Sequence, residues 1–102
     1  MKLNNNLFWD IWQLTIYFVN MVASLHSSKH DIFRTLLIEA RKDAQLTQVQ
    51  LAERLNIPQS FVSKYERGER RLDFTEFIEI ADLLGIDTSV FITNYKVKIA
   101  AN

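Results

Sequence analysis

The chain has 102 residues and a mass of 12.0 kDa, enough for one small domain. It contains no cysteine, two glycines and one proline, which excludes disulfides and thiolate chemistry and favours short helices joined by tight turns. The net charge is zero, yet residues 29–72 carry nine basic side chains against six acidic ones, whereas residues 73–102 carry two against five. The basic part has the charge asymmetry of a nucleic-acid-binding region, and the lack of cysteine fits a cytoplasmic location.

The most apolar segment, residues 7–25, approaches the length of a membrane span. Asp10 interrupts it and Lys2 is the only basic residue before it, which disfavours both a membrane anchor and a signal peptide. We therefore treat residues 1–28 as an N-terminal extension, either translated sequence upstream of a start at Met21 or an extra, loosely attached helix. As a helix it would pack its aromatic side chains against a partner chain. These are Phe8, Trp9, Trp12, Tyr17 and Phe18.

Five short helices are predicted after this extension. The first covers about residues 31–43, where apolar residues recur every three or four positions. The second covers about residues 47–55. Thr47 and Gln50 form a capping box at its start, and Asn56 tolerates the left-handed conformation that ends a helix.

Proline, glycine and acidic residues mark the next boundaries. The third helix runs from Pro58, which suits a first helical turn, to the residue before Gly68. The fourth opens with the capping pair Asp73 and Glu76 and ends at Gly85. The predicted fold class is therefore all-α.

The C-terminal region is harder to assign from its pattern. A fifth helix is expected after Asp87 and up to about Tyr95, while residues 96–102 read as either a frayed tail or a short strand. We assign residues 89–102 to a C-terminal tail that contributes to a dimer contact, because its apolar side chains exceed what a small core can hide. These side chains are Val90, Phe91, Ile92 and Tyr95.

The second and third helices and the turn between them form a helix-turn-helix, in which one helix braces the other in the major groove of DNA. Ala52 is small where the two helices must cross closely, and Leu51, Leu55 and Val62 fill the joint. The outer face of the third helix is hydrogen-bonding or cationic, which suits base edges and phosphates. It comprises Gln59, Ser60, Ser63, Lys64 and Arg67.

Three stretches resemble the phage Cro and lambda-type repressor family: T-Q-x-x-L-A-x-x-L from Thr47, P-Q-S-F-V-S-K-Y-E-R-G-E-R-R from Pro58, and A-x-x-L-G-I-D from Ala81. The resemblance covers about residues 31–87. It implies a compact five-helix, lambda-repressor-like DNA-binding domain at residues 29–88 that binds operator DNA as a homodimer, with neither catalysis nor a cofactor.

The resemblance also implies roles for single residues. Gln48 contacts a phosphate at the start of the second helix. Gln59, Ser60 and Lys64 reach base edges, where glutamine favours adenine and lysine favours guanine. Ser63 and Arg67 contact the phosphate backbone.

Further residues have supporting or alternative roles. Arg41 and Glu66 match positions that form an ion pair behind the recognition helix in this family. Phe61 would touch a thymine methyl group or pack half-buried, with packing favoured. Further candidate DNA contacts are Thr47, Arg70 and Arg71.

Other patterns carry less functional information. His26 and His30 have the i, i+4 spacing of metal ligands but no third ligand nearby, so no metal site is expected. The acidic residues of the fourth helix read as a solvated face rather than a catalytic cluster.

The leading prediction is thus a sequence-specific transcriptional repressor that binds a pseudo-palindromic operator as a dimer. The alternatives are an antitoxin or adaptor whose main partner is another protein, such as a toxin, and a membrane-tethered regulator, which is disfavoured.

Overall fold

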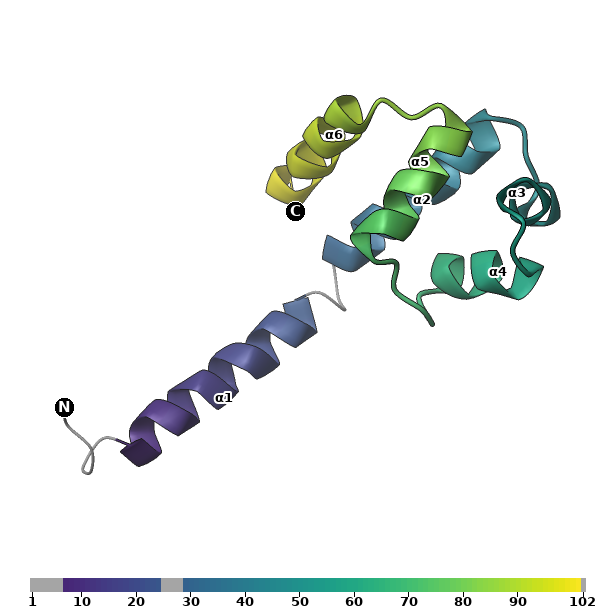
Figure 1. Cartoon of the computed structure of the whole chain (residues 1–102). Coiled ribbons are helices and arrows are strands. Elements are labelled where there is room, and N and C mark those ends of the chain that lie inside the picture. The colour runs from purple at the N-terminus through teal and green to yellow at the C-terminus, as the bar shows by residue number, and fades with distance from the viewer. Residues whose placement is uncertain (1–6, 25–28, 102) are drawn as a thin grey trace.

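The computed structural model describes residues 7–24 and 29–101, and this part of the chain forms six helices and no strand (Figure 1). The all-α prediction is confirmed. The helices are α1 (Leu7–Ser24), α2 (His30–Asp43), α3 (Gln48–Leu55), α4 (Gln59–Arg67), α5 (Phe74–Leu84) and α6 (Thr88–Ala101).

The boundaries of α3 follow from local chemistry. The Gln50 backbone amide donates to the Thr47 hydroxyl over 3.0 Å, and the Thr47 amide donates to the Gln50 side-chain carbonyl over 2.9 Å. Asn56 ends the helix with φ 57°, in the left-handed region. Both signals were readable in the sequence because they depend only on residues three or four positions apart.

The ends of α4 and α5 are also close to those predicted. Pro58 is the residue before α4 rather than its first helical residue, since its backbone is extended with ψ 145°. Gly68 ends α4 with φ 81°. At the start of α5, Asp73 and Glu76 form a capping box in which each side chain accepts a hydrogen bond from the backbone amide of the other residue.

The core lies where α2, α3, α4 and α5 meet. Leu37, Leu51, Val62, Tyr65 and Ile80 are its largest fully buried side chains. Ala52 is 2% exposed and α3 packs closely against α4, as the small residue at this crossing predicts. The core therefore holds the helix-turn-helix rigidly from behind.

The prediction for the C-terminus was wrong, because α6 continues as a helix to Ala101 and includes residues 96–101. Asp87 opens it by accepting hydrogen bonds from the backbone amides of Ser89 (2.9 Å) and Val90 (3.2 Å). No glycine or proline follows Asp87, so nothing in the local sequence stops the helix.

Phe91 also differs from its expected place on a dimer surface. It is 8% exposed and belongs to the core, where its ring lies 5.1 Å from that of Phe77 and 5.9 Å from that of Phe33. Its neighbours Val90 and Ile92 are about half exposed, at 54% and 48%. One face of α6 thus completes the core, and the other is open.

Residues 7–24 of the N-terminal extension form α1, which projects away from the other helices in Figure 1. None of the closely packed helix pairs includes it. Within residues 7–24 and 29–101, no helix is both long and apolar enough to cross a membrane.

Candidate nucleic-acid interface

The recognition helix α4 has two sharply different faces. Val62, Tyr65 and Glu66 point into the protein and are buried, at 0%, 1% and 6% exposure. The opposite face leaves Gln59, Ser60, Lys64 and Arg67 exposed, with Ser63 partly exposed. All five predicted contact residues of α4 therefore lie on its accessible side, in a helix whose rear is fixed by the core.

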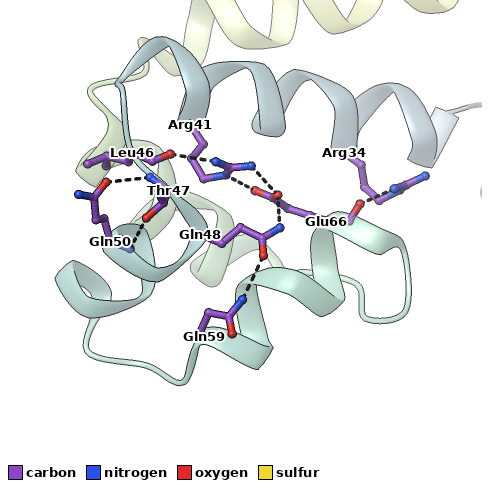
Figure 2. A network of polar contacts seen from close by, with 8 residues as sticks. All are labelled: Arg34, Arg41, Leu46, Thr47, Gln48, Gln50, Gln59 and Glu66. Atoms are coloured by element: carbon purple, nitrogen blue, oxygen red, sulfur yellow. Dashed lines mark hydrogen bonds and ion pairs between the residues drawn. The ribbon is translucent and has the colours of Figure 1, made fainter.

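An ion pair holds the rear of α4 to α2 (Figure 2). Arg41 Nε donates to Glu66 Oε2 over 2.7 Å, and Arg41 Nη2 donates to Glu66 Oε1 over 2.9 Å. The remaining Arg41 nitrogen donates to the backbone carbonyl of Leu46 over 2.8 Å. The hydrogen bond to Glu66 raises the pKa of Arg41. The bidentate geometry fixes the relative position of α2, α4 and the start of the helix-turn-helix.

A second arginine of α2 supports the same corner. Arg34 donates to the backbone carbonyl of Glu66 and to the Asp31 carboxylate, as Figure 2 shows for the first of these bonds. Its partner in that bond is a main-chain group near the end of α4, which no spacing pattern within α2 can indicate.

Gln48 links this ion pair to the exposed surface. Its Nε2 donates to Glu66 Oε1 over 2.8 Å, and its Oε1 accepts from Gln59 Nε2 over 3.1 Å (Figure 2). A continuous polar chain therefore runs from buried Arg41 to exposed Gln59. Gln48 and Gln59 were predicted as separate contacts, one to phosphate and one to a base, and the structure joins them at the shared edge of α3 and α4.

Phe61 and Arg70 form a supporting cluster beside α4. The Arg70 guanidinium lies 4.1 Å from the centre of the Phe61 ring and is bound by both Glu76 carboxylate oxygens, at 3.1 and 2.9 Å. Phe61 is half-buried, and its ring meets that of Tyr65 edge-on. These contacts agree with packing as the role of Phe61. They also bind the Arg70 guanidinium to Phe61 and Glu76 of the protein itself.

The remaining predicted DNA contacts differ in whether their side chains already bind other groups of the protein. Arg67 pairs with Glu69 at the surface, a contact that raises the pKa of Arg67 and lowers that of Glu69. The Ser63 hydroxyl donates to the Ser60 carbonyl over 3.2 Å. Arg71 and Lys64 are exposed, and the Thr47 hydroxyl serves in the cap of α3.

No metal-binding cluster of three or more His, Cys, Asp or Glu side chains occurs among the described residues. His26, one of the two histidines considered for such a site, lies outside them.

Known proteins share the helix-turn-helix that carries this surface. A family model described as helix-turn-helix matches residues 37–91, which include α3, the turn and α4. The chain is similar to the solved structure of an XRE-family like protein from Pseudomonas syringae pv. tomato str. DC3000, with a TM-score of 0.69 and 39% sequence identity. This similarity covers 78% of the present chain and 96% of the other. No protein of curated function matches significantly.

Proposed function

The chain belongs to the XRE-type helix-turn-helix family of Cro and lambda-like repressors, which are DNA-binding transcription regulators, and we propose that it represses transcription by binding a pseudo-palindromic operator as a dimer. In such a complex two α4 helices would occupy successive major grooves about 34 Å apart. Repression would follow because the bound dimer occupies DNA that RNA polymerase needs. The protein would act in the cytoplasm, where it meets its DNA.

The observation that carries this proposal is the exposed polar face of α4, which is accessible along its length while its rear is fixed by the Arg41–Glu66 ion pair. Amide, hydroxyl and ammonium groups are the side-chain chemistry that pairs with base edges. We assign base contacts to Gln59, Ser60 and Lys64.

Phosphate contacts set the register of the protein on DNA. We assign them to Gln48, Ser63 and Arg67, with Thr47 and Arg71 at the margins. Gln48 lies in the first turn of α3, where free backbone amides and the helix dipole attract an anion. Arg70 and Phe61 would shape the surface that flanks these contacts.

Selection of bound sites from a pool of random duplexes tests the proposal directly. We expect the pool to converge on two inverted half-sites separated by one helical turn. Convergence on a single half-site would contradict dimeric binding, and equal recovery of all sequences at physiological salt would contradict sequence-specific repression.

A second candidate, an antitoxin or adaptor, is favoured by the exposed apolar residues of α1, which suit a protein partner. An antitoxin would still protect cells from its toxin when Lys64 and Arg67 are both replaced by Ala, because those residues lie on the DNA-facing helix. Growth of cells that produce the toxin and this variant distinguishes the two functions.

A further inference from the structure

Helix α1 carries apolar side chains over most of its circumference, apart from a polar stripe that includes Asp10 and Gln13, and yet these apolar side chains are exposed. Tyr17 and Leu14 are 71% and 68% exposed, and Trp12, on another side of the helix, is 49% exposed. A broad apolar helix surface is normally buried against other apolar groups. Exposed apolar side chains gathered on one element are typical of a surface that another protein covers.

The dimensions of the chain give a measure of the surface that is left uncovered. Its accessible area is 7351 Å², whereas a compact monomer of this mass has about 6,000 Å². Its radius of gyration is 18.1 Å against about 13 Å for a compact domain of this length. The excess area exceeds the roughly 800 Å² that each partner buries in a stable dimer.

The same chain has an apolar groove of about 300 Å³ where the start of α2 meets α5 and α6. Four phenylalanines, Ile92 and Tyr95 line it, and Phe74 at its edge is 74% exposed. None of the lining residues comes from α1, so the helix does not fill the groove of its own chain. The phenylalanines are Phe33, Phe74, Phe77 and Phe91.

We propose that α1 of one copy lies in the aromatic groove of a second copy, and that the second copy returns the same contact. Because each chain carries one such helix and one such groove, reciprocal exchange closes a two-fold dimer and leaves neither surface open. An 18-residue helix is about 27 Å long, and α1 points away from its own domain, so it can reach a neighbour (Figure 1).

Charge and position agree with this arrangement. Asp10 is the only charged residue of α1, and Lys29 is one of the residues that line the groove, so the two surfaces carry opposite charges. The groove contains no residue of α3 or α4. The dimer therefore forms without covering the DNA-facing surface, and the inference does not depend on the proposed function.

Two double variants test the contact from its two sides. Trp12→Glu with Phe18→Glu alters α1, and Phe74→Lys with Ile92→Lys alters the groove. All four side chains are about half exposed or more, so the helical fold should persist, which circular dichroism checks. Gln13→Glu and Val97→Lys, at exposed positions of α1 and α6 outside the apolar contact, are the matched controls.

Light scattering across a concentration series, without DNA, gives the readout. The natural chain and both controls should form a dimer of twice 12.0 kDa. Each double variant should weaken self-association by about 30-fold or more, as expected for loss of buried aromatic anchors. A natural chain that stays monomeric at every concentration, or a groove variant that dimerises as well as the natural chain, would overturn the proposal.

Mixing the two double variants identifies which surfaces meet. A mixed dimer retains one unaltered helix and one unaltered groove, which face each other, and its second contact pairs Glu with Lys. We expect the mixture to dimerise although each variant alone does not. If the mixture stays monomeric, α1 and the groove are not the two surfaces that meet, and the proposal is wrong.

Discussion

Gln59 and Gln48 are joined by an amide-to-amide hydrogen bond, and Gln48 is held in turn by Glu66. A side chain fixed before binding loses less conformational entropy when it meets a base. Replacement of Gln48 therefore removes a proposed phosphate contact and also releases Gln59. Its effect on DNA binding should combine a general loss of affinity with a relaxed preference at one base.

Lys64 should affect one base position alone, since it is exposed and is proposed to read guanine acceptors. We expect Lys64→Ala to cost about 1–3 kcal/mol at one position of each half-site and to relax the preference there. Binding to a panel of single-base variants of the selected site measures this. Lys42→Ala, at an exposed position of α2, should leave the pattern unchanged. Uniform weakening would instead make Lys64 a phosphate contact.

Removing one partner of the Arg41–Glu66 pair should lower the free energy of unfolding much more than replacing both partners by apolar residues. Glu66→Ala leaves the guanidinium of Arg41, a residue that is 9% exposed, without its carboxylate partner, which should destabilise the fold by about 3–5 kcal/mol. Replacing both residues by Met should recover much of this loss, because apolar pairs of similar volume substitute well for buried ion pairs. Urea unfolding of the two variants measures the difference. A double variant as unstable as Glu66→Ala would contradict this interpretation.

For single residues, the sequence identified which side chains of α4 lie on its accessible face but not how that face is held in place. Arg41 and Glu66 were paired through the family resemblance. The bonds that Glu66 makes to Gln48 and Arg34 depend on the relative placement of α2, α3 and α4, which no periodicity within one helix specifies.

Helix boundaries are where the sequence was most informative. The caps at Thr47, Asp73 and Asp87 each act on residues two or three positions away, so short-range chemistry determines them. The burial of Phe91 depends on its packing against Phe33 of α2 and Phe77 of α5, and for this reason it was not predicted. The continuation of α6, in contrast, agrees with the absence of glycine and proline after Asp87.

Gly68 and Gly85 provide a matched test of a helix end. Both have positive φ, at 81° and 70°, but a Cβ at Gly68 would lie 3.2 Å from Arg34 Nε, whereas one at Gly85 would meet nothing within 4 Å. Gly85→Ala should cost about 1 kcal/mol from backbone strain, and Gly68→Ala about twice that. Chemical denaturation of both variants gives the comparison. Equal losses would show that Arg34 moves aside freely.

The cap of α5 should make stability depend on acidity. The hydrogen bond from the Glu76 amide lowers the pKa of Asp73, and the hydrogen bond with Arg70 lowers that of Glu76. Groups with lowered pKa stabilise the fold above their ordinary values of 3.8 and 4.5, and this contribution is lost as pH falls through the lower folded values.

We therefore expect the melting temperature to fall in this acidic range, and to fall less steeply in a variant with Asp73→Asn and Glu76→Gln. Thermal unfolding from neutral to acidic pH measures both slopes. Asp82→Asn, at an exposed site on the same helix, is the control and should keep the natural slope.

For the molecule as a whole, zero net charge conceals a basic region, residues 29–72, that includes α3 and α4. Attraction to phosphates then depends on local charge and should weaken steeply with salt. Arg67→Ala should reduce the slope of log affinity against log salt by about 0.9, the contribution of one phosphate contact. Arg54→Ala, at an exposed position near the end of α3, should leave the slope unchanged. An unchanged slope for Arg67→Ala would remove it from the set of phosphate contacts.

The position of the tryptophans gives the molecule an internal optical reporter. The chain has two, Trp9 and Trp12, and both belong to α1, outside the helix-turn-helix. Tryptophan emission therefore reports on the surroundings of α1 alone, without a label. Entry of α1 into an aromatic groove would shift this emission to shorter wavelength as protein concentration rises, while DNA added to an existing dimer would leave it nearly constant. Tryptophan emission would thus report assembly through α1 independently of DNA binding.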